Sequence, residues 1–141
     1  MPLMKVLLDM NVLLDWLLKR APFANEATQV IRLAELKTIE LHFAAITLTN
    51  AYYIARIPKG VAFATSFVES IRRLGKIVSL DERVIDRALK LSVSDFEDAI
   101  QAASAERAGV DFIITRDRSD FVNSPVPRLQ PAGHVKHFET R

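Results

Sequence analysis

The amino-acid sequence predicts an α/β fold: a single three-layer α/β/α domain over residues 1–141, built around a mostly parallel central sheet. Short apolar runs alternate along the chain with longer segments of helical periodicity, which is the order of elements in such folds. The short runs are apolar throughout, as is typical of strands that helices cover on both faces. A length of 141 residues suits one domain with one core.

The first half of the chain begins with the apolar run KVLLD and reaches a second one, IELHFAAI. Apolar residues at helical spacing lie between them and after them. Thr47 is a candidate N-cap for the helix after the second run. The segment RIPKG at 56–60 contains a proline and a glycine and is the strongest internal break. We expect strands over residues 5–9 and 39–46, and helices over residues 11–20, 21–38 and 47–57.

The second half repeats the alternation. Ser94 and Glu97 match the S-x-x-E capping box at the start of an alanine-rich helix, which Gly109 closes. The alanines at 99, 102, 103 and 105 would let this helix lie close to the sheet. Prolines restrict the last strand, within residues 127–135, to an edge of the sheet. We expect strands over residues 76–80 and 110–115, and helices over residues 61–75, 81–91 and 94–109.

Composition excludes several classes of site. The chain has no cysteine, which excludes disulfides, thiolate metal ligands and a cysteine nucleophile and fits a cytoplasmic protein. No apolar run approaches the roughly 20 residues that span a membrane. A net charge of +2 is too small to indicate nucleic-acid binding by itself.

Carboxylates gather where a parallel sheet binds its ligands, beyond the carboxyl ends of the strands. Asp9 ends the first strand, and Asp117 and Asp120 follow the strand at 110–115. Asp98 lies in the first turns of the helix that leads into that strand. Several carboxylates in one cleft need a compensating cation, and an oxygen-only ligand set favours Mg²⁺ or Mn²⁺. Such a site suits phosphodiester hydrolysis.

Each of these residues also has a structural interpretation. Asp9 could begin an ordinary loop, and Asp117 or Asp120 could be a turn residue. Glu97 is favoured at a helix start by the helix dipole. Asp15 could be a polar position on a partly exposed helix face, or it could support the site from outside the ligand set.

Four segments resemble, in order, the PIN domain: VLLDMNVLLDWLLKRAPF, AAITLTNAYYIAR, LSVSDFEDAIQAASAERAGVDFIITRDRSDF and SPVPRLQPAGH. The resemblance covers roughly residues 3–133 and is closest to small single-domain members, which include VapC-type toxins. It implies a Mg²⁺- or Mn²⁺-dependent endoribonuclease that forms homodimers and is held inactive by an antitoxin. It assigns catalysis to Asp9, Asp98 and Asp120, metal binding to these three and Asp117, and supporting roles to Asn11 and Thr115.

One position departs from the family pattern. The second acidic position of the family is a glutamate, and here it is Asn50. An amide oxygen can still bind a cation but brings no charge, so Asp15 or Glu97 would have to supply it. A non-catalytic PIN-like binding module with a decayed metal site is therefore the alternative.

A third possibility, a phosphatase or receiver domain, is disfavoured. A phosphatase would carry Asp-x-Asp after the first strand, where this chain has Asp9, Met10 and Asn11. A receiver would have a single helix between its second and third strands, and here we expect two. For the expected homodimer, Phe23, Tyr52 and Tyr53 are the candidate interface residues.

Overall fold

A parallel sheet of five strands organises the molecule, in the order β3-β2-β1-β4-β5. This computed structural model describes residues 3–117, 119 and 121–133. The apolar strand β1 is central and has neighbours on both sides, while β5 lies at one edge, as its prolines require. The strands are β1 (Met4–Leu8), β2 (Ile39–Ala44), β3 (Gly75–Val78), β4 (Phe112–Ile114) and β5 (Arg128–Leu129).

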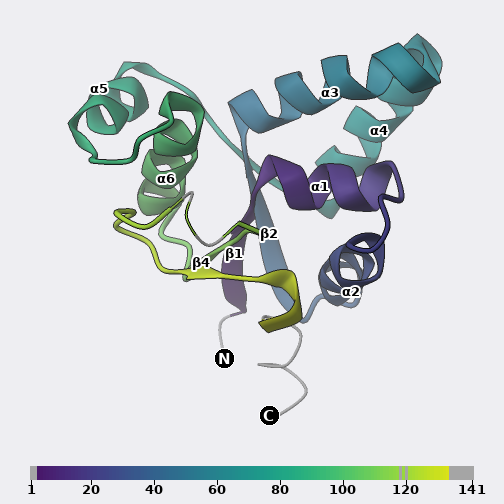
Figure 1. Ribbon diagram of the computed structural model, residues 1–141, viewed down its shortest axis with the longest axis horizontal. Coiled ribbons are helices and arrows are strands. Elements are labelled where there is room, and N and C mark those ends of the chain that lie inside the picture. Colours follow the sequence, from purple (N-terminus) through teal and green to yellow (C-terminus); the bar gives the residue numbers. More distant parts are fainter. Residues whose placement is uncertain (1–2, 118, 120, 134–141) are drawn as a thin grey trace.

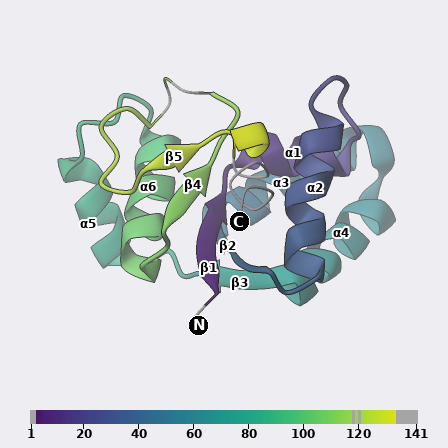
Figure 2. The ribbon, with the colours of Figure 1, turned by 90° about the horizontal axis from the view of Figure 1, so that it is seen from below.

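Helices cover both faces of the sheet, which confirms the predicted three-layer α/β fold (Figures 1 and 2). One face carries α1 (Met10–Leu17), α2 (Ala24–Glu35), α3 (Ala45–Lys59) and α4 (Val61–Leu74). The other carries α6 (Phe96–Ala108), on which α5 (Glu82–Lys90) packs. No helix in the described part of the chain is long and apolar enough to cross a membrane.

Alternate residues of β1 face the two layers, because successive side chains of a strand point to opposite faces. Val6 and Leu8 belong to the core under α1 and α2, whereas Leu7 packs with Ala102 and Ala105 of α6. Both alanines are fully buried, which confirms that small side chains bring α6 close to the sheet. Strands buried on both faces explain why the runs in the sequence are apolar throughout.

Two predicted helix starts are wrong by one to three residues. The N-cap of α3 is Ala44, so Thr47 lies inside the first turn, where it is buried. The N-cap of α6 is Asp95, whose Oδ1 accepts a hydrogen bond from the Asp98 amide at 3.0 Å, so Ser94 and Glu97 form no capping box. A carboxylate at the N-cap also interacts favourably with the helix dipole, which favours Asp95 over the neighbouring serine.

The break between the helices at RIPKG is a single residue, Gly60, and is shorter than the sequence suggests. The helix α3 continues through Pro58 to Lys59 and ends at Gly60, whose φ of 88° is accessible to glycine. Proline removes one hydrogen bond to the carbonyl four residues earlier. That carbonyl belongs to Ile54, a residue that is 39% exposed.

Candidate metal centre at the carboxyl edge of the sheet

Asp9 lies where β1 ends and α1 begins. Its backbone is extended, with φ of −66° and ψ of 149°, and it is the N-cap of α1. Its amide donates to the carbonyl of Ile114 at 2.9 Å, which extends the pairing of β1 with β4 by one residue and places Asp9 beside Thr115. The residue is only 2% exposed, so the sheet edge buries this carboxylate.

Two side chains hold the Asp9 carboxylate. The Thr115 hydroxyl donates to Oδ2 at 2.8 Å, and the Gln101 amide donates to Oδ1 at 3.1 Å. Burial raises the pKa of Asp9 above its usual value, while the bonds from Thr115 and Gln101 and the charge of Arg116 act in the opposite direction. A cation bound beside Asp9 would offset the cost of burying its charge and favour the ionised form.

Gln101 connects the two acidic positions. Its Nε2 also lies 3.5 Å from Oδ1 of Asp98, and its Oε1 accepts from the Thr47 hydroxyl at 3.3 Å. The Asp9 and Asp98 carboxylates are thus neighbours around one nitrogen atom. No motif in the sequence marks Gln101 as a site residue. The available signal was its spacing, because residues three apart share a helix face and Gln101 follows Asp98 by three.

The loop after β4 carries the next candidates. The Asp117 carboxylate is exposed and accepts two hydrogen bonds from Ser119, from the amide at 2.9 Å and the hydroxyl at 2.8 Å. The Asp117 amide donates to the Thr115 hydroxyl oxygen at 3.2 Å, so Thr115 links this loop to Asp9. Asp120 lies outside the described residues.

Asn11 and Glu97 lie near the starts of two helices. Asn11 is in the first turn of α1, directly after the Asp9 cap, and is partly buried. Glu97 is in the first turn of α6, beside Asp98, and is also partly buried.

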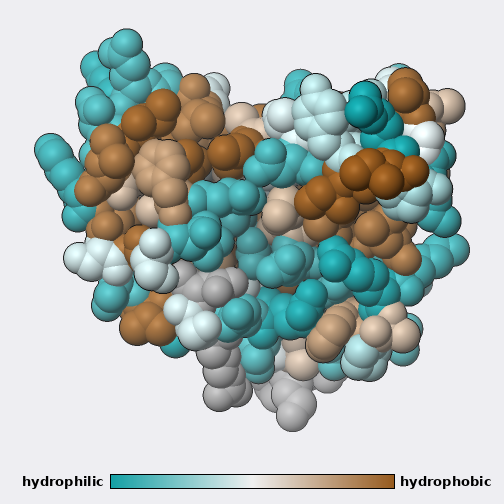
Figure 3. Space-filling view, turned by 45° about the horizontal axis from the view of Figure 1, so that its top comes forward, coloured by the Kyte–Doolittle hydropathy of each residue, from teal (hydrophilic) through white to brown (hydrophobic). Residues whose placement is uncertain are grey.

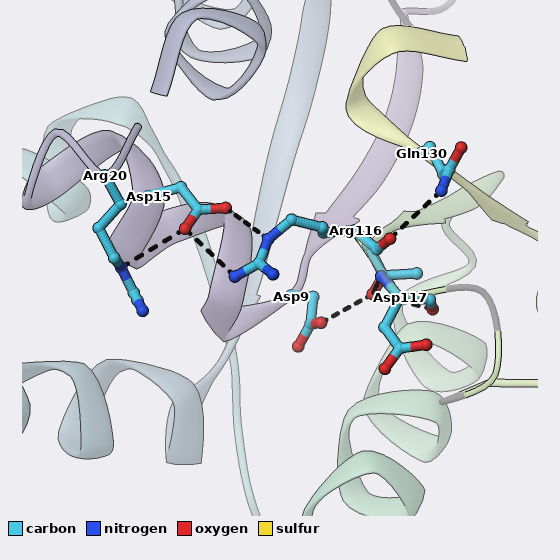
Figure 4. Close-up of polar contacts among 7 residues, drawn as sticks. Asp9, Asp15, Arg20, Arg116, Asp117 and Gln130 are labelled. Carbon is cyan, nitrogen blue, oxygen red and sulfur yellow. Dashed lines mark hydrogen bonds and ion pairs between the residues drawn. The ribbon is translucent and has the colours of Figure 1, made fainter. Parts of the chain in front are cut away.

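One interpretation of the sequence, that Asp15 lies on a partly exposed helix face, is wrong. Its side chain is 2% exposed and pairs with Arg116, whose Nε and Nη2 lie 2.9 and 3.4 Å from the two carboxylate oxygens (Figure 4). Arg20 Nε lies 3.4 Å from Oδ1. The negative charge of Asp15 is therefore paired with two guanidinium groups.

Asn50 lies on α3 and is partly buried. It follows Thr47 by three residues, so the two share a face of the helix. Because Thr47 bonds to Gln101, this face of α3 is directed toward the acidic pair. The position is thus consistent with that of an additional ligand.

The chemistry of these donors fits a hard divalent cation. Asp9 and Asp98 provide carboxylate oxygens, which are the ligands that hard divalent cations prefer. Both carboxylates lie close to the same hydrogen-bond donor, Nε2 of Gln101. Among the described residues, no three acidic or histidine side chains come together as a ligand group. Asp9 and Asp98 are the two neighbouring carboxylates that would hold a metal ion here.

Several solved structures share the fold of this chain. VapBC2 from Rickettsia felis, bound to a promoter DNA fragment, is 15% identical, with a TM-score of 0.69 over 90% of this chain and 98% of that chain. VapC20 from Mycobacterium tuberculosis, a toxin that cleaves the sarcin–ricin loop, is 15% identical, with a TM-score of 0.70 over 89% and 99%. DNA-bound VapBC from Salmonella typhimurium is 17% identical, with a TM-score of 0.70 over 92% and 99%. At these identities the similarity establishes the fold.

Sequence comparison gives the family. No curated protein sequence matches the chain. The family model of the PIN domain matches residues 5–119, a span that runs from β1 past β4 and contains Asp9, Asn50, Asp98 and Thr115. The chain therefore belongs to the PIN-domain family.

Proposed function

We propose that the protein is a Mg²⁺- or Mn²⁺-dependent endoribonuclease and the toxin of a toxin–antitoxin pair. The observation that carries the proposal is the buried Asp9 carboxylate, which shares the Gln101 amide with Asp98 at the carboxyl edge of the sheet. Membership of a family of nucleases and the shared fold with toxins support it. Asp117 and Asp120 are the further ligands that the proposal assigns to the loop after β4.

The residues around the pair have distinct tasks in this proposal. Asp9 and Asp98 would hold the cation, which when bound activates a water molecule and neutralises charge on the phosphate. Thr115 and Gln101 fix the direction of the Asp9 carboxylate through hydrogen bonds at 2.8 and 3.1 Å. Such partners of a ligand orient it and tune its basicity.

Cation binding and RNA cleavage test the proposal. The purified protein is stripped with EDTA, and its melting temperature is followed as Mg²⁺ or Mn²⁺ is added. In parallel, a structured RNA is incubated with the same samples. We expect both cations to raise the melting temperature and to produce defined cleavage products. Stabilisation without cleavage would favour a binding module.

The non-catalytic alternative rests on Asn50. With an amide in place of a carboxylate, the site has one negative charge fewer than the family pattern provides. In that case the PIN fold would serve to bind a protein or RNA. The cleavage assay distinguishes the two functions, because a module of this kind would bind without producing RNA fragments.

Asn50→Glu should tighten Mg²⁺ binding by about an order of magnitude, because ligand charge sets the affinity for hard cations. The effect should be smaller for Mn²⁺, which binds such sites more tightly than magnesium through its position in the divalent series. Calorimetric titration measures both affinities. Thr49→Glu is the matched control, since it adds the same charge at the neighbouring exposed position of α3. Equal affinities in the two variants would mean that Asn50 does not face the cation.

A cognate antitoxin is the proposed protein partner. The solved structures that share the fold include a toxin–antitoxin complex from Klebsiella pneumoniae. At such low sequence identity the similarity establishes only the shared fold. The partner is therefore inferred from the proposed toxin function. Co-expression with the product of a neighbouring reading frame, followed by purification of a stable complex, would support it.

We also expect a homodimer, held through α3 and α4. The exposed large hydrophobic side chains of α3 are Tyr53, Ile54 and Ile57, which is 86% exposed. Figure 3 shows hydrophobic surface on this side of the molecule and also on the side of α5 and α6. Phe23 is a poorer candidate than the sequence suggested, because the Arg116 guanidinium lies 4.0 Å from its ring centre. Light scattering at tens of micromolar should give a dimer mass, and Ile57→Lys should give a monomer. Leu89→Lys, on the distant helix α5, should remain dimeric.

A further inference from the structure

A cationic cluster lies beside the acidic pair. It consists of Arg116 and Arg20, both paired with the buried Asp15 (Figure 4), and of Phe23, whose ring lies under the Arg116 guanidinium. The main chain of Arg116 is also held, because Gln130 donates to its carbonyl at 3.3 Å. Two guanidinium groups against one carboxylate leave the cluster with one net positive charge.

Stability is a weak explanation for this arrangement. Burying a carboxylate and the arginines that pair with it removes charge from water, and well-packed apolar residues often do as well or better. The pair does fix the direction of one guanidinium. Asp15 accepts from Nε and Nη2 of Arg116, and the ring of Phe23 fixes the plane of the group.

The fixed guanidinium keeps a free edge. A guanidinium has five N–H donors, and Asp15 uses one edge of the Arg116 group. Within the described residues no acceptor is bonded to its Nη1, and the side chain is 32% exposed. A cavity of about 250 Å³ opens here, lined by Asp15, Phe23, Glu26, Arg116 and Gln130 among others, so Arg116 shares it with a second carboxylate besides Asp15. A planar group with a free edge in an open cavity suits the bidentate binding of a phosphate.

Chain connectivity places this cation next to the proposed cleavage site. Arg116 directly follows Thr115, whose hydroxyl donates to Asp9. An RNA strand that brings one phosphate to Asp9 and Asp98 carries further phosphates on either side. Those phosphates would be repelled by the carboxylates unless a cation receives them.

We propose that Arg116, oriented by Asp15 and Phe23, binds a backbone phosphate of the RNA that flanks the acidic pair. This inference rests on the proposed ribonuclease function and adds a phosphate subsite to it. Asp15 is then a positioning residue, which explains why a carboxylate is buried in an otherwise apolar helix six residues after Asp9.

The test measures RNA binding without cleavage. A fluorescein-labelled single-stranded RNA of mixed sequence is titrated in EDTA, and its anisotropy is followed at several NaCl concentrations. The variant is Asp15→Asn with Arg116→Met, which removes both charges of the Asp15–Arg116 pair and leaves Arg20, whose side chain is 39% exposed, without its carboxylate partner. The net charge of the chain stays at +2, so any loss of binding cannot come from the overall field.

We expect this double variant to bind the RNA about tenfold more weakly and to lose about 0.7 from the salt slope, the contribution of one phosphate contact on a single strand. Arg72→Met is the control. It removes an exposed arginine from α4 and lowers the net charge by one, yet should change binding less than twofold. If the double variant melts early, Arg116→Lys is tested instead. It keeps the charge but cannot bind Asp15 and a phosphate by two edges, so it should show the same loss of affinity with a smaller change of the salt slope.

The outcomes separate the subsite from the ribonuclease function. Binding that is equal in wild type and both Arg116 variants would overturn the subsite, even if wild type cleaves RNA. Binding that depends on Arg116, without cleavage in Mg²⁺ or Mn²⁺, would support the subsite and contradict the ribonuclease. Wild type that binds no RNA in EDTA would also overturn the subsite.

Discussion

Asp9→Asn should stabilise the metal-free protein and abolish its response to divalent cations. Wild type should gain about 2.7 kcal/mol of unfolding free energy when Mg²⁺ is present at a hundred times its dissociation constant, and the variant should gain none. RNA cleavage should fall by more than about 100-fold, since even partners of metal ligands typically contribute 10- to 100-fold. Chemical denaturation with and without Mg²⁺, together with the cleavage assay, measures these changes.

The pH dependence of stability should differ between wild type and Asp9→Asn. Burial raises the pKa of Asp9 above its ordinary value of 3.8, so the folded protein holds this proton more tightly than the unfolded chain. The stability from Asp9 is thus fully present below pH 3.8 and is lost as pH rises through the raised pKa. The variant avoids this loss, and its advantage should grow with pH in EDTA. Glu40 and Glu106, whose pKa values are lowered by Lys76 and Arg87, act in the opposite sense but equally in both proteins.

Asp111→Asn is the matched control for Asp9→Asn. Asp111 is an exposed carboxylate just before β4, at the opposite edge of the sheet, where it accepts from the Lys5 amide at 2.9 Å. This variant should respond to Mg²⁺ as wild type does. A normal Mg²⁺ response in Asp9→Asn would mean that the cation binds elsewhere.

Gln101→Leu should lower the free energy of unfolding by about 1–3 kcal/mol, which is the effect of leaving buried polar groups without partners. The change removes the donor to Asp9 and the acceptor for Thr47, both of which are buried. It should also weaken Mg²⁺ binding. The lost hydrogen bond helps to lower the pKa of Asp9, and a ligand that holds its proton more tightly binds metal less well at a given pH.

Ser104→Ala, one turn further along α6, is the control for Gln101→Leu. Ser104 is equally buried, but its hydroxyl has no hydrogen-bond partner among the described residues. Removing it should leave stability unchanged or raise it. Urea denaturation compares the midpoints of both variants. A midpoint of Gln101→Leu equal to that of Ser104→Ala would show that the Gln101 bonds contribute nothing.

Local patterns in the sequence predicted the sheet and one end of the site. Apolar runs are a property of each strand by itself, and Asp9 stands out because it ends one of them. The partners of Asp9 depend on how α6 is placed against β1, which no local pattern contains. Gln101 is a neutral residue in an alanine-rich helix and looks like any exposed glutamine. Asp15 and Arg116 are 101 residues apart, so their pairing exists only after folding.

The helix start at Asp95 shows a smaller limit. Ser94 and Asp95 are both residue types that favour the N-cap position. The sequence pattern alone does not choose between them, because Ser94 with Glu97 also matches a capping box. The choice depends on where the chain leaves α5, because that sets which of the two side chains can reach an amide of the first turn. The structure selects Asp95, whose carboxylate bonds to the amide of Asp98. The same bond steadies the backbone of an acidic site residue.

The alanine face of α6 makes the acidic site depend on residues that no substrate touches. Ala102 and Ala105 are fully buried in one cluster with Leu7 and Ile113, and interiors this dense rarely admit another methylene without movement. Gln101 reaches Asp9 across the same narrow gap, and a misplacement of about 1 Å can lower a catalytic rate roughly 100-fold. Under the proposed toxin function, a genetic selection for harmless alleles would therefore yield mutations on the inner surface of this helix as readily as at the acidic positions.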